Sequence, residues 1–327
     1  MHTSIANLTF GVEFEVILPS PYNRETGADR VAELAGFPVN SRGSVNGQWK
    51  VVYDGSVSGA GQGLEFVSPV LKGDDGLEQV RKVCAAFNQM GVTVNHTCGF
   101  HVHVGARNEG VDFFKTLGKL YARYEETLDE IMPRPRRGNA NNYCRSIKLH
   151  IPQLDRATTV REAISAFPSR YHKLNLAAFA KHSTVEFRQH SGTVDASKAV
   201  NWIITCLKLV AAAKAGKTGA GPRIARDFSR LDAKARAVAE AISKPEGATA
   251  DEIRAAHGFK ALSIKRQAAI AGIELRTVKQ RGKERFFLVA TTDPARTIPA
   301  TLDGLAEVIE LDAAEAEYLR ARSLAVA

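Results

Sequence analysis

Two glutamates on a strand-like segment are the first residues in this sequence that could do chemistry. Residues 10–17 read Phe-Gly-Val-Glu-Phe-Glu-Val-Ile, so Glu13 and Glu15 alternate with apolar residues. In a strand, alternate side chains share a face, so both carboxylates point to one side and their apolar neighbours to the other. Two like charges on a half-buried face need a cation to neutralise them. We therefore expect a divalent ion here, most simply Mg²⁺, together with a nucleoside triphosphate.

Two later segments carry candidate ligands in the same pattern. Asp54 ends one predicted strand in an Asp-Gly turn, and Glu65 lies among apolar residues on the next. A strand glutamate that faces a core needs a partner. His101 and His103 share one face of a third predicted strand, and the glycines at its two ends allow close approach of other atoms.

A last segment alternates acid and base on one predicted strand face, with Glu186, Arg188 and His190 at every second position. Taken singly, each of these segments also fits a solvent-facing strand or a core with satisfied hydrogen bonds. Four strands of this kind would make one sheet face strongly polar. Such a face indicates a ligand cleft.

The composition is that of a globular protein with a sizeable core. The chain has 327 residues, 44% hydrophobic and 24% charged, which suits one large or two medium domains. No run of about 18 apolar residues occurs, and the N-terminal residues lack the regions of a signal peptide, so we expect a cytoplasmic protein without membrane contact. The four cysteines have no CxxC spacing, which favours free thiols over disulfides or a thiolate zinc site.

Basic residues are concentrated in one segment. Lys and Arg outnumber Asp and Glu by 25 to 20 in residues 1–216 and by 16 to 8 in residues 217–290, whereas residues 291–327 have 3 against 7. The Gly-rich, Pro-ended stretch 216–222 cannot hold regular structure and marks a boundary. We predict a catalytic domain over 1–216, a linker over 217–232, a second domain over 233–290 and an acidic helical extension over 291–327. The extension would pack on a neighbouring domain or mediate assembly into a homo-oligomer.

The first domain has an α+β order of segments. We expect several antiparallel strands with helices on one side. The predicted strands are 8–18, 49–53, 64–69, 99–104 and 183–188, and the predicted helices are 77–90, 111–131 and 196–214.

The ordered series of polar segments resembles the amidoligase family of the carboxylate–amine ligase superfamily, whose relatives include glutamine synthetase and glutamate–cysteine ligase. The segments are GVEFEV, YDGS, GLEFVSP, CGFHVHVG, RYHKLNL and VEFRQHSGT, within about residues 5–215. The resemblance implies a curved antiparallel sheet like that of the glutamine synthetase catalytic domain, with a concave face that binds ATP and Mg²⁺, or Mn²⁺ in its place. It implies ATP-dependent phosphorylation of a carboxylate, followed by attack of an amine on the acyl phosphate to form an amide or isopeptide bond.

The resemblance also implies roles for single residues. The metal ligands would be Glu13, Glu15, Glu65, His101, His103 and Glu186, and one of the two histidines would bind metal or a phosphate oxygen. Arg188 would clamp the transferred phosphoryl group, because its planar fork suits that charge. Glu186 would act with it in catalysis.

Other polar residues are candidates for substrate binding. Asp54 could hold or deprotonate the incoming ammonium. The groups suited to ATP or a carboxylate are His101, His103, Arg145, Lys148, Arg170, Tyr171, Lys173, Asn175, Arg188 and His190, although a solvated helix face explains Arg145 and Lys148 nearly as well. The basic stretch 133–143 reads either as a mobile loop that closes over the triphosphate or as a plain connector.

The second domain resembles a winged helix-turn-helix module in its element order. Predicted helices at 233–243, 250–257 and 263–271 precede predicted strands at 274–280 and 284–290. The recognition helix and the wing would offer Lys265, Arg266, Gln267, Arg281, Lys283 and Arg285 to DNA. Protein contacts are the alternative use of such a module.

Two other functions fit the same residues. One is a regulatory or nucleic-acid-binding protein whose ligase-like domain binds nucleotide without turnover. The other is a metal-dependent hydrolase, since His101 and His103 with carboxylates also suit Zn²⁺ or Mn²⁺. If the protein is a ligase, its substrates are a small-molecule or peptide carboxylate and an amine, and the sequence identifies neither.

Overall fold

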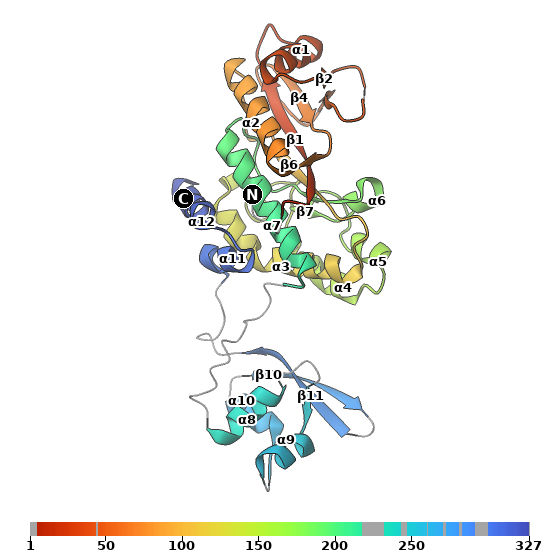
Figure 1. The fold of residues 1–327 in the computed structure, drawn as a ribbon, viewed down its shortest axis with the longest axis vertical. Helices are drawn as coiled ribbons and strands as arrows, with labels where there is room; N and C mark the ends of the chain where they lie inside the picture. Colours follow the sequence, from red (N-terminus) through yellow and green to blue (C-terminus); the bar gives the residue numbers. More distant parts are fainter. Residues whose placement is uncertain are drawn as a thin grey trace. The chain divides into compact units, whose positions relative to one another are not determined.

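A computed structural model describes residues 5–43, 45–217, 232–242, 247–259, 261–270, 273–280, 283–291 and 300–326. The chain divides into two compact units, one of Met1–Gly219 with Ala300–Ala327 and one of Ala220–Pro299. The second unit is therefore inserted in the sequence of the first, and both are drawn in Figure 1. The predicted linker, 217–232, lies outside the described residues except at its two ends.

The first unit is α+β and is built on one eight-stranded sheet. The strands run in the order β2-β3-β4-β1-β6-β8-β7, with β5 beside β1. Their bounds are β1 Thr9–Leu18, β2 Val39–Asn40, β3 Trp49–Tyr53, β4 Gln62–Val67, β5 Leu71–Lys72, β6 Phe100–Gly105, β7 Leu174–Asn175 and β8 Thr184–Phe187. The β2–β3 pair is parallel and the other pairs are antiparallel. The sheet is thus mixed: the expected antiparallel pairing holds for most of it, and the parallel β2–β3 pair at this edge departs from it.

Helices flank the sheet, and the three longest pack together. Contacts join α2 and α3 to α7 and α7 to β6, and Figure 1 shows these helices beside the sheet. The helices of this unit are α1 Arg24–Ala35, α2 Gly73–Gln89, α3 Val111–Glu130, α4 Ile151–Arg156, α5 Val160–Ile164, α6 Ala178–His182, α7 Ala196–Lys214, α11 Leu302–Val308 and α12 Ala313–Val326, with single 3-10 turns η1 at Arg134–Arg136 and η2 at Lys148–His150.

Alternation along β1 decides which sheet face is the core. Val12, Phe14 and Val16 are at most 1% exposed, and the Phe14 ring lies 5.6 Å from that of Phe87 on α2. Burying a large apolar side chain contributes about 1.5–3 kcal/mol to stability. A one-residue shift in the register of this strand would expose several of these side chains at once and lose the stabilisation that each provides. The odd-numbered residues between them, Glu13 among them, are thereby fixed on the opposite face.

By length and composition alone, α7 could cross a membrane. However, 67% of the most apolar 18-residue stretch of this helix is buried inside the protein, and the helix contacts α2, α3 and β6. Burial against these elements accounts for its composition, so α7 is a core helix of the first unit.

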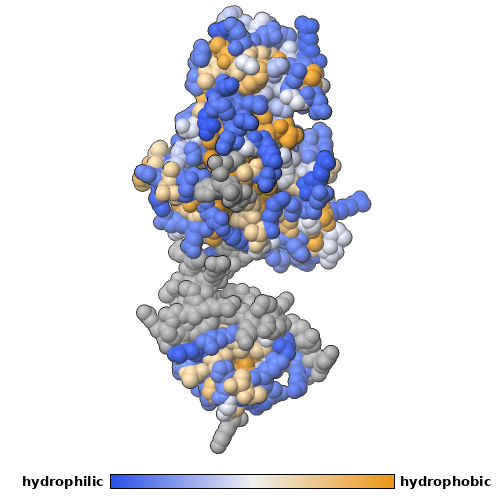
Figure 2. Space-filling view, viewed as in Figure 1, coloured by the Kyte–Doolittle hydropathy of each residue, from blue (hydrophilic) through white to orange (hydrophobic). Residues whose placement is uncertain are grey.

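On the face in view, Figure 2 shows apolar side chains interspersed with hydrophilic ones.

The last two helices complete the first unit. Leu305, Ile309 and Leu319 belong to its main hydrophobic core. Lys208 of α7 is 2% exposed, donates to the Glu310 carbonyl oxygen at 2.8 Å and forms an ion pair with Glu315. The described part of the acidic extension therefore packs back on the first unit, one of the two roles expected for it.

Within its described residues, the second unit has three helices and a three-stranded sheet in the order β10-β11-β9. Its elements are α8 Ala233–Ile242, β9 Ala248–Thr249, α9 Ala250–His257, α10 Ile264–Ile270, β10 Ile273–Gln280 and β11 Lys283–Thr291. Thr249 begins α9 in a capping box with Glu252, and Val238, Ile253 and Phe286 form part of a separate small core. The winged-helix assignment stays a prediction.

Candidate active site

Four neighbouring strands bring the predicted acids and histidines together. β1 lies between β4 and β6, and β6 pairs with β8. The opposing pairs are Glu15 with Glu65, Glu13 with His101, and His103 with Glu186. Side chains opposite each other on one sheet face have Cβ atoms about 4.5–5.5 Å apart. Strand register therefore assembles residues that are far apart in the sequence into one polar surface.

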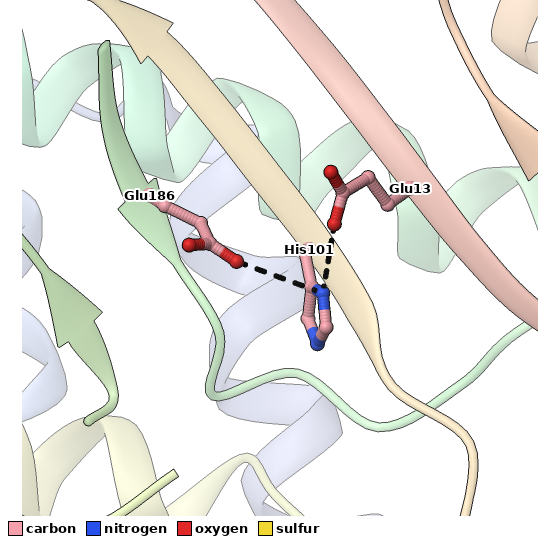
Figure 3. A group of neighbouring side chains, drawn as sticks. All are labelled: Glu13, His101 and Glu186. Atoms are coloured by element: carbon pink, nitrogen blue, oxygen red, sulfur yellow. Dashed lines mark hydrogen bonds and ion pairs between the residues drawn. The ribbon is translucent and has the colours of Figure 1, made fainter. Parts of the chain in front are cut away.

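The first ligand group consists of Glu13, His101 and Glu186, which offer ligand atoms within 4.8 Å of one another. The His101 Nδ1 atom is 3.1 Å from Glu13 Oε2 and 3.7 Å from Glu186 Oε1. Figure 3 shows the imidazole between the two carboxylates, which come from the strands on either side of β6. His103 adjoins this group, with Nε2 3.4 Å from Glu13 Oε1.

The second ligand group consists of Glu15, Asp54 and Glu65, again within 4.8 Å of one another. Glu15 Oε2 accepts a hydrogen bond of 2.5 Å from the Gly99 N–H, and Glu15 Oε1 is 3.5 Å from His101 Nε2. His101 thus contacts both groups. The two groups lie next to each other on one sheet face.

Crowded charge shifts the pKa values of these carboxyls. Burial, followed by the charges of Glu13, Glu15 and Asp54, raises the pKa of Glu65 to about 9. Burial also acts to raise the pKa of Glu13, but hydrogen bonds and charge from the two histidines hold it well below its ordinary value. A carboxyl that its neighbours force to keep a proton is one that a nearby cation would relieve.

The donor set fits hard divalent cations. Carboxylate oxygens suit Mg²⁺, and imidazole nitrogens beside them also suit Mn²⁺. The buried Nε2 atom of His103 lies 3.4 Å from Glu13 Oε1 and 3.9 Å from Glu186 Oε1, so it belongs to the same set of possible ligand atoms. Glu13, Glu15, Glu65, His101, His103, Glu186 and Asp54 are the residues that could hold such ions.

Arg188 places a guanidinium beside the first group. It forms an ion pair with Glu186, whose other carboxylate oxygen accepts a 2.6 Å hydrogen bond from Asn175 Nδ2. Burial acts to raise the pKa of Glu186, but Arg188 first and then the histidines lower it. Asn175, predicted to bind ATP or substrate, thus orients the Glu186 carboxylate. The guanidinium carries five N–H donors, so the pair with Glu186 leaves others for an anion.

Two lysines predicted for the site lie elsewhere. Lys173 is fully buried, with Nζ 2.6 Å from Asp129 Oδ1 and 3.4 Å from Glu125 Oε1. Lys148 pairs with the exposed Glu126 of α3 at 2.5 Å. Lys173 therefore links buried segments of the core. Lys148 lies on a solvated surface, which is the alternative that the sequence left open for it.

His190 lies in the core and not beside Glu186. It is 5% exposed and its ring packs against Phe100 and Trp202. The regular strand ends at Phe187, so the alternation that placed His190 on the polar face no longer holds there.

Burial of His190 makes stability depend on pH. Desolvation lowers its pKa to about 4 from an ordinary value of 6.5, so the native state keeps the ring neutral. The neutral ring therefore makes its full contribution to the free energy of unfolding above pH 6.5. As the pH falls, this contribution decreases, and at pH 4 it is smaller by about 3 kcal/mol. We expect the stability difference between wild type and His190→Asn to shrink by about that amount over this range. Urea unfolding followed by tryptophan fluorescence measures it, since both tryptophans belong to the first unit; a constant difference would contradict the assignment.

Sequence reasoning missed two side chains of the site. Thr184 Oγ1 lies 2.9 Å from His103 Nδ1, and the strand alternation that flagged Glu186 could have found it. Arg136 is 4% exposed and its Nη2 donates to the Cys98 carbonyl oxygen at 2.5 Å. Arg136 lies in the stretch 133–143, for which the sequence left a mobile loop and a plain connector open, and its side chain is buried.

Gly99 lets Arg136 and the ligands approach the backbone. A Cβ atom there would lie 2.7 Å from His101 Nε2, 3.0 Å from Arg136 Nη2 and 3.2 Å from Glu15 Oε2. We expect Gly99→Ala to displace these groups and to lower activity at least about tenfold, with a stability cost of about 1–3 kcal/mol. Activity and unfolding assays test this against Gly110→Ala, whose added Cβ meets nothing within 4 Å. Equal effects of the two variants would contradict it.

The cations predicted to bind DNA are in part neutralised within the second unit. Lys283 Nζ is 2.9 Å from Asp251 Oδ2, and Arg285 Nη2 is 2.5 Å from Glu252 Oε1. On α10, Lys265 and Arg266 are exposed and Gln267 is half-buried, whereas Arg281 lies outside the described residues.

Comparison with known proteins gives one family. Its sequence profile, described as "Putative amidoligase enzyme", matches residues 6–210. A search of curated proteins finds no match. The matched span includes both ligand groups and Arg188, so the family and the polar face coincide. The chain belongs to the amidoligase family.

Proposed function

We propose that the first unit is an ATP- and Mg²⁺-dependent carboxylate–amine ligase with a glutamine synthetase-like arrangement of its sheet. The observation that carries this proposal is the pair of adjacent ligand groups on one sheet face with Arg188 beside them. A triphosphate needs positive charge along its length and on the group in transfer. A hydrolase with a single metal-bound water would need only one of these two ligand groups.

The reaction would proceed in two steps. Divalent ions in the two groups would supply positive charge to the triphosphate. Arg188 would donate hydrogen bonds to the phosphoryl group as it passes from ATP to the substrate carboxylate, giving ADP and an acyl phosphate. The amine would then attack the acyl carbon and release phosphate. Asp54, which lies in the second group, would accept the proton of the incoming ammonium or serve as a ligand.

The test is ADP release by the full chain with Mg·ATP and separate pools of free carboxylic acids and of acidic peptides, each combined with amines, with mass spectrometry for amide products. Amine-dependent ADP release with a new amide is the expected result. Nucleotide binding without ADP from any pool would favour the regulatory alternative, and product formation without ATP would favour the hydrolase. Either outcome would overturn the ligase proposal.

For the second unit we propose DNA as a partner, supported by the exposed Lys265 and Arg266 on α10 and by the basic excess of residues 217–290. Duplex binding by the full chain should weaken as salt rises, and Lys265→Gln with Arg266→Gln should lower the salt slope. Binding that is unchanged in the double variant, or absent at low salt, would leave protein contacts as the role of this unit.

A further inference from the structure

A cavity of about 420 Å³ lies beside Arg188, outside the two ligand groups. Its lining consists of Asn142, Tyr143, Arg145, Ser169 and Tyr171, and we call it the tyrosine pocket. Arg188 Nε donates to the Tyr143 carbonyl oxygen at 3.3 Å, and its guanidinium lies 6.0 Å from the centre of the Tyr171 ring. Arg188 therefore contacts the first ligand group and two of the residues that line the pocket.

Backbone hydrogen bonds fix the pocket relative to the ligand groups. The Arg188 N–H donates to the Lys173 carbonyl at 2.8 Å, and the Lys173 N–H donates to the Arg145 carbonyl at 2.9 Å. Neighbouring strands lie about 4.8 Å apart, so the Arg145 backbone is roughly 10 Å from that of Arg188. The buried ion pair of Lys173 with Asp129 anchors the middle segment. The pocket is thus held at a set distance from the reacting centre.

Positive charge and open aromatic rings characterise the pocket. Arg145 donates to Asn142 Oδ1 at 2.8 Å, and Arg170 lies 5.1 Å from the centre of the Tyr171 ring. Among the described residues that line the pocket, no side chain is a carboxylate. Tyr143 is 50% exposed, and its ring meets that of Tyr171 edge to face at 5.4 Å. Exposed tyrosine and arginine are the residues most enriched where proteins bind other chains.

We propose that the tyrosine pocket docks an acidic peptide segment, so that the carboxylate that reacts is a side chain or terminus of a peptide and not of a free small acid. This inference rests on the proposed ligase function, because it names the class of acid substrate. Charge complementarity selects the occupant, because the guanidiniums of Arg170 and Arg188 lie 5.1 Å and 6.0 Å from the centre of the Tyr171 ring and favour anionic chains. A nucleic acid strand would also suit arginine and tyrosine, but it brings no carboxylate to Arg188.

The experiment measures peptide binding to the full chain by fluorescence anisotropy in Mg²⁺. The probe is a labelled peptide of alternating glutamate and glycine with blocked ends, and its reference is the same peptide with glutamine. We expect the acidic peptide to bind about tenfold more tightly than the reference, and Arg145→Gln to remove that difference, since a charge-assisted hydrogen bond contributes on this order. Arg81→Gln, an exposed arginine on α2, is the matched control and should change nothing.

Several outcomes would overturn the proposal. These are equal binding of the two peptides, an unchanged preference in Arg145→Gln, displacement of the peptide by glutarate at the same concentration, or tighter Arg145-dependent binding of a single-stranded oligonucleotide. The readouts separate this proposal from the ligase function. Arg145-dependent peptide binding without ADP release from any pool would refute only the ligase. ADP release with free acids that is unaltered in Arg145→Gln would refute only the docking.

Discussion

Replacing Arg188 by methionine is expected to lower the kcat of amine-dependent ADP release by about a thousandfold or more. The guanidinium is the cation nearest the first ligand group among the described side chains, held there by its pair with Glu186 and its hydrogen bond to the Tyr143 carbonyl. Charge that develops on the transferred phosphoryl group would lose this donor, whereas binding of ATP would be affected less. Steady-state kinetics with the substrates found in the pools would measure the change in kcat and KM separately.

Two further variants make the Arg188 result specific. Arg188→Lys keeps the charge but loses the planar fork, so it should recover only a part of the rate. Arg81→Met removes an exposed arginine of α2 and should leave kcat unchanged. A kcat for Arg188→Met within about tenfold of the wild type would show that the guanidinium does not contact the group in transfer.

The polar face was predictable because strand alternation is a local property of the sequence. The pattern around Glu13 required a buried side of valines and phenylalanines and a second side of acids, and β1 has that division. The same reasoning placed His101 and Glu186 on the correct faces of β6 and β8. Register was not predictable, since it depends on which strands become neighbours in the sheet. Only the structure shows that Glu13 opposes His101 while Glu15 opposes Glu65.

Several residues that sequence reasoning misplaced or missed have no local signal in the sequence. His190 follows the last residue of β8, and its ring turns to Trp202 in the core. Lys173 is charged, but two carboxylates of α3 compensate its burial, and such a partner 44 positions away leaves no local signal. Arg136 is one of several arginines in a loop, and nothing in the sequence distinguishes the buried one.

The division of the chain shows the same limit at a larger scale. Composition located the Gly-rich boundary after α7, but it could not show that the chain returns to the first unit at Ala300. That return depends on long-range contacts such as the hydrogen bond of Lys208 to the Glu310 carbonyl. The basic second unit is therefore an insertion in an amidoligase unit whose last helices follow it in the sequence.

Replacing Glu13 by glutamine is expected to weaken Mg²⁺ binding at least about tenfold and to lower kcat about a hundredfold or more. Glutamine keeps the shape of the side chain but removes the charge that interacts with His101 and His103. In the wild type, Mg²⁺ should raise the midpoint of thermal unfolding, since an ion that binds only the folded state stabilises it by mass action. The midpoint of Glu13→Gln should rise only at higher Mg²⁺ concentrations. Tryptophan fluorescence reports this transition, because Trp49 and Trp202 both belong to the first unit.

A matched acid on the protein surface separates a ligand from a general effect of charge. Glu126 on α3 is exposed and pairs with Lys148, so Glu126→Gln removes the same charge away from the ligand groups. Its response to Mg²⁺ should equal that of the wild type. If Glu13→Gln and Glu126→Gln respond alike, Glu13 is not a ligand and the first group loses its central carboxylate. If only Glu13→Gln is shifted while its unfolding midpoint without Mg²⁺ stays near that of the wild type, the loss lies in ion binding and not in the fold.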